Sequence, residues 1–367
     1  MWTYQIHDTI TGDLRHGVQV ADASWSTMLS DIGGGQHKVM TTGSGLMGFQ
    51  WRDLLYPWAN TFVQCWNGVP VFAGLILGWT LDRKTKLITV RHKELRLILN
   101  RRFPFRVGAR EGQPHFTVRD KSLRGVITEL VRVGLSRSDG GDGWNVPIGM
   151  PSGSEAGNSG TTLFTYDFVT IENAIAEVED RDGGPDVHFN PRFTAAGRLE
   201  WELQIGKPRL FGETYDFAMN VPGPALVGVE PTVDGTEMLT GVFTIGKGSE
   251  KKMRVGEAGL VQLPVRPKPI PFLDSSRSFK EIDSIADLNA HGVAELRSHG
   301  APTEQWEVKA VAGVGFNPAL VRPGCVVRMR YENDWWEGTR DVDQYVVGVS
   351  GSHEKTITLD VQPLGGL

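Results

Sequence analysis

The chain has few cysteines and no long apolar run, and both absences limit what it can be. Cys65 and Cys325 are its 2 cysteines, too few for a disulfide framework or a four-cysteine metal site, so we expect buried free thiols. The longest apolar run, VPVFAGLILGW from Val69, is shorter than the ~20 residues that span a bilayer. The N-terminus lacks a basic segment followed by an apolar stretch. We therefore expect no signal peptide and no membrane insertion, and we expect a soluble chain made in the cytoplasm.

An excess of charge of one sign is also missing. The net charge is −5 and charged residues make up 22% of the chain, which is ordinary for folded proteins and argues against disorder. No stretch rich in Lys and Arg stands out, so sequence-independent binding to nucleic acid is not expected. The chain has 367 residues, 40% of them hydrophobic, which predicts two to four compact units with buried cores.

Motifs that would mark a nucleotide or catalytic site are incomplete. Gly43, Gly45 and Gly48 have the G-x-G-x-x-G spacing of a dinucleotide site. The motif needs a βαβ unit and an acidic residue ~20 positions later, whereas we expect an antiparallel hairpin to follow here. The 9 histidines form neither H-E-x-x-H nor H-x-H, and G-x-S-x-G does not occur.

Acidic residues are present, but their patterns predict turns and strands. Glu200 and Glu202 could serve as a glycosidase pair, yet they alternate with apolar residues and so indicate the solvated face of a strand. The stretch DRDGGPDVHF, residues 180–189, fails the calcium-loop pattern, with Gly184 at its fifth position. We interpret it as the end of a helix leading into a hairpin. We assign no catalytic, cofactor-binding or metal-binding residue, and we predict a protein that is not an enzyme and has no cofactor.

What the chain has in abundance is turn residues, with 45 glycines and 20 prolines between short segments, which favours β structure. Asn67-Gly68 between two apolar runs predicts a two-residue hairpin turn. Residues 187–193 and 199–205 alternate around Ala195-Ala196-Gly197, and in that hairpin Val187 faces Ile205 and Arg192 faces Glu200.

Helical periodicity is confined to a few segments. Apolar spacing predicts one helix over residues 119–134, a second that begins after a possible N-cap at Thr170, and a third over residues 284–299. At the start of the third, Ser284 and Asp287 resemble a capping box. Residues 137–160 are rich in Gly, Ser and Pro and predict an exposed loop. Residues 263–272 hold four prolines and predict an extended strap, with recognition as a PxxP ligand a minor alternative.

Two features near the C-terminus stand apart. Trp335 and Trp336 fall in a polar turn, YENDWWEG, where they would pack in a core or an interface, or stack on a sugar ring. The segment FAGLILGWTLDRKTKLITV resembles QYVVGVSGSHEKTITLDV, since each has an apolar strand, a polar turn and a β-branched strand. This repeat is weak evidence for a duplicated barrel.

The order of these segments resembles the minor tail, or tail hub, proteins of long-tailed bacteriophages, especially those that infect actinobacteria. The blocks that carry the resemblance are HDTITGDLRHGVQVADASWSTMLS, PWANTFVQCWNGVPVFAGLILGW, EVEDRDGGPDVHFNPRF, ALVGVEPTVDG, AELRSHGAPTEQWEV, VRPGCVVRMRYE and YVVGVSGSHEKTITLDV. They span most of the chain. Cys325 stands where an acidic residue would be expected.

The resemblance implies an α+β, β-dominated fold with two tube-type small β-barrel domains, an inserted α/β region and a few short helices. We expect the first barrel in residues 1–102, an α/β accessory domain with the exposed loop in 103–214, and the second barrel, including the strap and the helix at 284–299, in 215–367. The resemblance also implies a trimer, in which the two barrels of each chain give the ring quasi-sixfold symmetry.

The expected function is that of a structural virion protein made in the host cytoplasm and located at the phage tail tip. It would close the distal end of the tail tube and attach tip proteins or fibres. The implied partners are further copies of the chain as a homotrimer, the distal tail protein, the tape measure protein and tip or fibre proteins, with DNA passing only transiently. A trimer carries a formal −15, three times −5, which suits a lumen that repels phosphate. The alternatives are a carbohydrate- or receptor-binding tail component and, last, a tail-associated cell-wall hydrolase.

Overall fold

The computed structural model describes residues 1–105, 112, 115–135, 146–151, 155–181, 183–259, 270–280, 282–313 and 315–364. Its fold is α+β and β-dominated, as the sequence predicts. The chain forms two compact units. The first comprises Met1–Val229 and Glu307–Val361, and the second comprises Glu230–Trp306 and Gln362–Leu367. The predicted division at residues 102 and 214 is finer than this one, and it stays a prediction.

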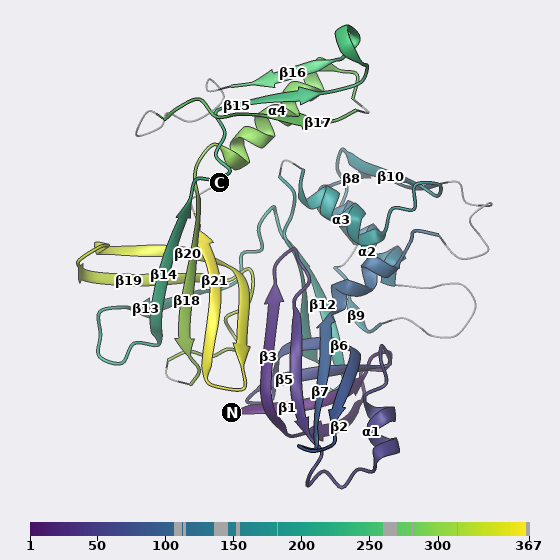
Figure 1. Ribbon diagram of the computed structural model, residues 1–367, viewed down its shortest axis with the longest axis vertical. Helices are drawn as coiled ribbons and strands as arrows, with labels where there is room; N and C mark the ends of the chain where they lie inside the picture. Colours follow the sequence, from purple (N-terminus) through teal and green to yellow (C-terminus); the bar gives the residue numbers. More distant parts are fainter. Residues whose placement is uncertain are drawn as a thin grey trace. The chain divides into compact units, whose positions relative to one another are not determined.

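The first β region lies at one end of the first unit (Figure 1). Its elements are β1 (Trp2–Asp8), β2 (Leu14–Val18), β3 (Val20–Met28), β4 (Gly34–Met40), α1 (Gly48–Leu54), β5 (Asn60–Trp66), β6 (Val69–Asp82) and β7 (Leu87–Glu94). In the sheet they follow the order β3-β4-β7-β6-β5-β1-β2. The predicted turn at Asn67-Gly68 is confirmed, since both residues have positive φ, 50° and 82°, as a two-residue hairpin with two left-handed positions requires.

Strand β5 is buried along its whole length because structure covers both of its faces. Phe62 points into a core with Ile6, Val39 and Ile88 inside the first β region. Val63 and Cys65 belong to a second core, shared with the α/β segment that follows. Both cysteines are free and buried, as predicted.

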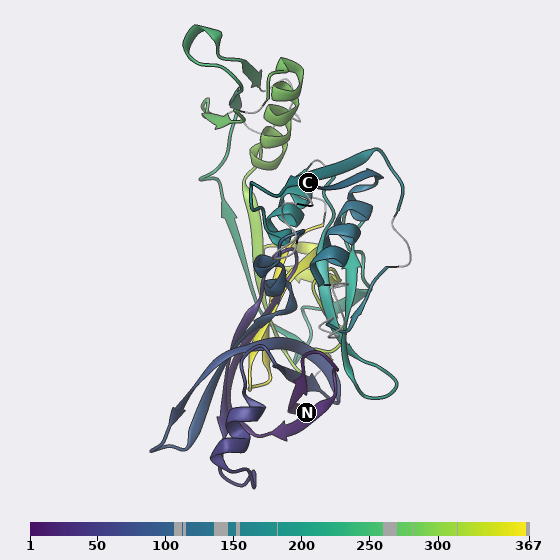
Figure 2. The same ribbon diagram turned by 90° about the vertical axis from the view of Figure 1, so that its right-hand side faces the viewer.

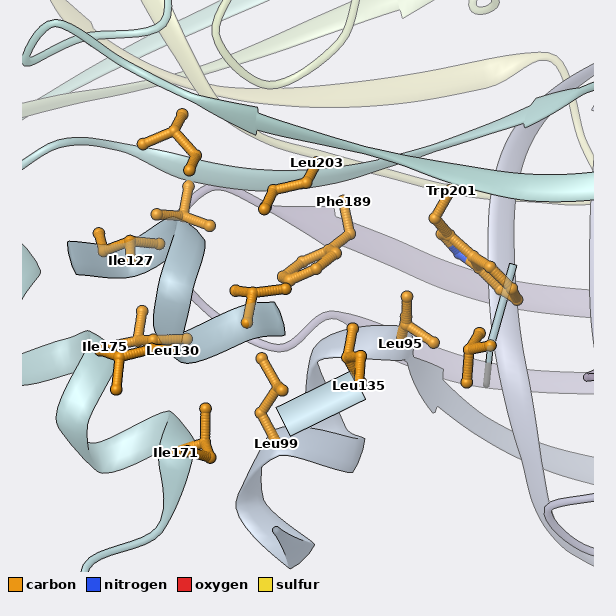
Figure 3. Packing of buried hydrophobic residues seen from close by; sticks show 14 of the residues in the cluster. Leu95, Leu99, Ile127, Leu130, Leu135, Ile171, Ile175, Phe189, Trp201 and Leu203 are labelled. Atoms are coloured by element: carbon orange, nitrogen blue, oxygen red, sulfur yellow. The ribbon is translucent and has the colours of Figure 1, made fainter. Parts of the chain in front are cut away.

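The α/β segment surrounds that second core. Its elements are η1 (Leu95–Arg101), β8 (His115–Lys121), α2 (Leu123–Leu135), β9 (Ile148–Gly149), β10 (Ser159–Phe164), α3 (Ile171–Glu179), β11 (Val187–Phe193) and β12 (Leu199–Ile205). Figure 3 shows α2, α3 and η1 presenting Leu130, Ile175 and Leu99 toward Phe189 and Trp201 of the β11–β12 hairpin. The apolar stripes that predicted α2 and α3 are therefore the faces that fill this core.

The β11–β12 hairpin has the predicted register. Val187 faces Ile205, Phe189 faces Leu203 and Arg192 faces Glu200. The acidic stretch before it is the predicted helix end, because α3 stops at Glu179 and β11 begins at Val187. Thr170 caps α3 by accepting a hydrogen bond from Asn173 N at 3.2 Å. Residue 182 lies outside the described residues.

Three expectations for this first unit need correction. The predicted exposed loop at 137–160 includes β9 and the start of β10, and Val146 in it is buried; residues 137–145 and 152–154 lie outside the described residues. Residues 119–121 belong to β8, so the predicted helix starts later, as α2. The element directly after Gly43 and Gly45 is α1 rather than a hairpin; Trp51, Leu54 and Leu55 have helical spacing and are buried, and that pattern was the missed signal.

The second β region repeats the strand order of the first. Its strands are β13 (Thr214–Ala218), β14 (Leu226–Asp234), β18 (Thr303–Val311), β19 (Val326–Asp334), β20 (Gly338–Ser352) and β21 (Thr356–Pro363). They pair in the order β14-β18-β21-β20-β19-β13, which corresponds strand for strand to β3-β4-β7-β6-β5-β1. The two regions differ where β13 runs parallel to β19, whereas β1 runs antiparallel to β5.

Individual hydrogen bonds repeat as well. Met40 N at the end of β4 donates to Gln19 O just before β3, at 2.9 Å, and Val311 N at the end of β18 donates to Ala225 O just before β14, at 3.0 Å. Strand β20 joins the two regions into one sheet by pairing residues 348–352 with β3. The weak sequence repeat therefore corresponds to equivalent hairpins, β6–β7 and β20–β21.

The second unit contains β15 (Gly241–Ile245), β16 (Val255–Ala258), β17 (Asp274–Ser278), η2 (Glu250–Lys252) and α4 (Ile285–His299). Helix α4 packs Leu296 against Val242 and Ala258 of the sheet. Its predicted N-cap is confirmed, since Ser284 Oγ accepts from Asp287 N at 3.3 Å. By its contacts this helix belongs to the second unit. Of the predicted strap, residues 263–269 lie outside the described residues.

Candidate assembly surfaces

The described part of the chain contains no group of three or more His, Cys, Asp or Glu side chains that could hold a metal ion. None of its helices has both the length and the apolar character needed to cross a membrane. Glu200 and Glu202 both pair with Arg192, at 2.7 and 3.0 Å, on the polar face of their strand, as the alternation predicts. The features that remain are surfaces by which the chain could meet other chains.

The junction between the two β regions is one such surface, already occupied within the chain. The ring centroids of Trp2 on β1 and Trp66 at the end of β5 are 4.8 Å apart. Trp66 lies against Gly313: a Cβ atom placed on Gly313 would be 3.6 Å from Cζ2 of Trp66. Trp2 Nε1 donates to Glu354 O at 2.7 Å in the turn between β20 and β21. A tryptophan pair from the first region thus packs on the β18–β19 connector (residues 312–325) and the β20–β21 turn of the second.

Arg322 anchors the same connector. Its Nη2 donates to Pro70 O at 2.7 Å, just after the β5–β6 turn, and its Nε donates to Ala319 O at 3.0 Å. Its Nη1 donates to Asn190 Oδ1 on β11. One guanidinium therefore links the first β region, the α/β segment and the second β region.

We expect Arg322→Met to lower the free energy of unfolding by about 2 to 3 kcal/mol, because it leaves several carbonyl oxygens unpaired in a largely buried site. Arg330→Met is the control, since that exposed side chain pairs with Asp216 at 2.9 Å and its loss costs under about 1 kcal/mol. Urea denaturation of both variants measures the difference. Equal losses would contradict the anchoring role.

A pocket beside α1, the α1 pocket, is the counterpart of that docking surface in the first β region. It has a volume of about 700 Å³ and lies between the β4–β5 connector, which contains α1, and the end of the β6–β7 hairpin. Its wall contains the apolar side chains of Leu46, Trp51, Leu55, Trp79 and Ile88. Figure 2 shows α1 at the far end of the first β region, in purple-blue. This size is in the range of cavities that enclose a ligand of several rings.

The lining of the α1 pocket is apolar and basic. Met47, Phe49, Tyr56, Trp58 and Leu81 are exposed nearby in sequence, on the same connector and hairpin. The pocket-lining residues also include Arg52, Arg83 and Lys86 and no carboxylate. Among the described residues, none of these three cations has a carboxylate within ion-pair distance. Exposed aromatic and basic residues around a pocket are typical of a protein interface.

The β19–β20 turn carries the opposite surface. Trp335 and Trp336 are 89% and 70% exposed, so neither is buried in a core of this chain. Their ring centroids are 5.5 Å apart. Asp334 Oδ1 accepts hydrogen bonds from Trp336 N and Glu337 N, both at 2.9 Å, which fixes the turn and holds the pKa of Asp334 below its usual value. The turn thus presents two exposed tryptophans between acidic residues.

Two buried polar clusters stabilise the first unit beneath these surfaces. Arg96 donates from Nε to Glu172 at 2.7 Å and from Nη2 to Glu179 at 2.5 Å, which ties η1 to α3. In the first β region His37 Nδ1 lies 2.6 Å from His92 Nε2, and His37 Nε2 lies 2.8 Å from Gln64 Oε1. Burial lowers the pKa of His37 to about 4. We assign both clusters to stability.

Comparison with known proteins gives the fold. No family model matches the sequence, and no curated protein matches it. The chain is similar in structure to the 43 kDa tail protein of prophage MuSo2 from Shewanella oneidensis, with a TM-score of 0.59 and 9% identity over 98% of each chain. It is similar to a tail protein from Neisseria meningitidis, with a TM-score of 0.54 and 10% identity over 100% of this chain and 97% of that one.

A third similar structure is the c3393 protein of E. coli, a component of the type VI secretion system, with a TM-score of 0.51 and 9% identity. That match covers 99% of this chain and 77% of the other. The chain therefore has the fold of phage tail proteins, a fold also found in this secretion-system component.

Proposed function

We propose that the chain is a structural protein of a phage tail, a hub that forms a ring of three copies at the distal end of the tail tube. The observation that carries the proposal is the duplicated strand order of the two β regions, which gives each copy two similar β regions joined in one sheet. Three such copies present six similar β regions, and that arrangement suits contact with a sixfold tube. The fold shared with phage tail proteins supports the same assignment.

In this proposal each β region is a tube-type barrel and the α/β segment decorates the outside of the ring. The distal tail protein, the tape measure protein and tip or fibre proteins are the neighbours, and DNA passes through the opening. The resemblance of several sequence blocks to tail proteins of phages that infect actinobacteria is the reason for proposing such a host. The protein acts by geometry and charge, and the proposal includes no catalytic residue.

Negative-stain electron microscopy of the purified chain tests the proposal, together with sedimentation of the same sample. We expect threefold rings with a central opening and a mass of about 121 kDa, three times 40.4 kDa. Single particles of 40.4 kDa at every concentration would contradict the ring. Binding to a glycan array by such particles would favour a receptor-binding tail component instead.

A further inference from the structure

We propose that the β19–β20 turn of one copy, with Trp335 and Trp336, docks into the α1 pocket of a neighbouring copy and so joins the ring. The inference rests on the proposed ring and names the residues that close it. Its basis is internal: the contact between the two β regions inside the chain predicts the contact between chains, because the second region repeats the first.

The correspondence of elements defines both sides of this contact. The β5–β6 turn of the first region corresponds to the β19–β20 turn of the second, since β5 and β6 hold the sheet positions of β19 and β20. The β4–β5 connector with α1 corresponds to the β18–β19 connector, residues 312–325. The end of the β6–β7 hairpin corresponds to the β20–β21 turn.

Inside the chain, Trp66 and Pro70 beside the β5–β6 turn contact the β18–β19 connector, and Trp2 of the adjacent strand β1 contacts the β20–β21 turn. Trp2 and Trp66 form the apolar part of that contact. The equivalent contact between copies places the β19–β20 turn on the α1 connector and the end of the β6–β7 hairpin. These two elements line the α1 pocket. Trp335 and Trp336 would then occupy the neighbour's pocket as Trp2 and Trp66 occupy the junction here.

The strand pairing of β6 leaves an edge beside the α1 pocket where a strand of a neighbouring copy could pair. Residues 348–352 of β20 pair with β3 in addition to lying beside β21. The equivalent residues of β6, 78–82, pair with β7 but with no second strand in the described part of the chain. Trp79 and Leu81 of this free stretch line the α1 pocket. On β20 this strand edge is occupied by β3. In the described part of the chain, the equivalent edge of β6, beside the α1 pocket, has no partner strand.

Charge and size agree with this occupant. The turn carries Glu332, Asp334 and Glu337 around its tryptophans, against one cation, Arg340, which pairs with Glu337. The pocket lining carries Arg52, Arg83 and Lys86 and no acid. Two indole rings fit within about 700 Å³, and Trp and Arg are among the residue types enriched at the energetic centre of interfaces.

The contact joins two different surfaces of one chain, so it is heterologous and generates a closed ring when its rotation fits. It therefore makes a prediction that a symmetric contact does not make. A chain with a defective turn keeps a working pocket, and a chain with a defective pocket keeps a working turn.

The experiment uses two full-length variants. The turn variant carries Trp335→Ala and Trp336→Ala, and the pocket variant carries Arg83→Glu and Lys86→Glu. Both change exposed side chains, so circular dichroism and melting curves should match the wild type. The matched control replaces another exposed aromatic pair, Phe164→Ala and Tyr166→Ala, whose ring centroids are 5.2 Å apart.

We expect each variant alone to sediment at 40.4 kDa, with association weakened on the order of 100-fold or more. An equimolar mixture should form dimers of about 81 kDa, twice 40.4 kDa, and no rings, because only one working contact remains. The control should form rings like the wild type. Rings in either variant alone would overturn the docking contact and leave the proposed hub standing. A wild type that never forms rings would instead contradict the hub itself.

Discussion

Arg96→Met lowers the free energy of unfolding by about 3 to 5 kcal/mol, the largest single-residue effect that we expect in this chain. The Arg96 side chain is 3% exposed and its guanidinium holds two glutamates. Burial raises the pKa of the Glu172 and Glu179 carboxyls even in the presence of Arg96. Without the guanidinium, two carboxyl groups remain close together in a buried site, where an uncompensated charge is costly.

Urea denaturation measures the loss, and Arg192→Met is the matched control. Arg192 also bridges two glutamates, but its side chain is 46% exposed, so its removal costs under about 1 kcal/mol. A second variant separates charge from packing: adding Glu172→Leu and Glu179→Leu to Arg96→Met recovers most of the stability. Similar losses for Arg96 and Arg192, or no recovery in the triple variant, would contradict the assignment.

The second large effect is a loss of stability in acid that depends on the His37–His92 pair. His37 Nε2 donates to Gln64 Oε1, so its Nδ1 accepts from His92 Nε2 and both rings are neutral. Burial lowers the pKa of His37 to about 4 and that of His92 well below 6.5. In the unfolded chain both titrate near 6.5, so the unfolded state binds more protons between these values.

Because the unfolded state binds more protons, acidification lowers the free energy of unfolding. The stability from each neutral histidine is fully present above pH 6.5 and is lost as the pH falls toward the folded value. For His37 alone the loss between pH 7 and pH 4.5 is about 2 to 3 kcal/mol, and His92 adds to it. Glu94 acts in the opposite sense, because burial raises its pKa to about 7 and its protonation in the folded chain adds stability as the pH falls.

The measurement is therefore a difference between two proteins. The wild type is compared with the variant His37→Gln, His92→Phe by urea denaturation from pH 7.5 to 4.5, and Glu94 is common to both. We expect the wild type to lose stability relative to this variant on acidification by about 3 kcal/mol or more. The exposed His115→Gln should give no such difference. Parallel curves for wild type and the double variant would show that the pair does not set the acid sensitivity.

Local patterns in the sequence predicted the elements whose partners are near in the chain. The β11–β12 register follows from two alternating strands and a turn with Gly197 at a φ of 75°, so each residue's partner could be counted. Helices α3 and α4 were predicted with their caps, because Thr170 and Ser284 stand directly before an apolar stripe. Helix α1 was missed because it has seven residues and gives a short periodic signal.

Features that depend on distant pairing could not be predicted in this way. Strands β8 and β10 pair across some 40 residues that include a Gly- and Ser-rich stretch, so neither has a neighbouring partner to reveal it. The pairing of β20 with β3, which joins the two β regions, links the ends of the chain. The α1 pocket combines a connector with the end of a hairpin that follows 25 residues later, and nothing local in either segment marks the cavity.

The duplicated strand order also makes the second unit an insertion. In the first region β3 runs into β4 through a loop of five residues, whereas between their counterparts β14 and β18 the chain builds β15, β16, β17 and α4 before returning to the neighbouring strand. The chain leaves the sheet from β14 and returns to it in the neighbouring strand β18, so the second unit interrupts the sheet order at a single place. A short turn could replace it without changing the order of any strand, and a different domain could occupy the same position. Proteins that share this fold could thus exchange this part while the remainder of the chain keeps its architecture.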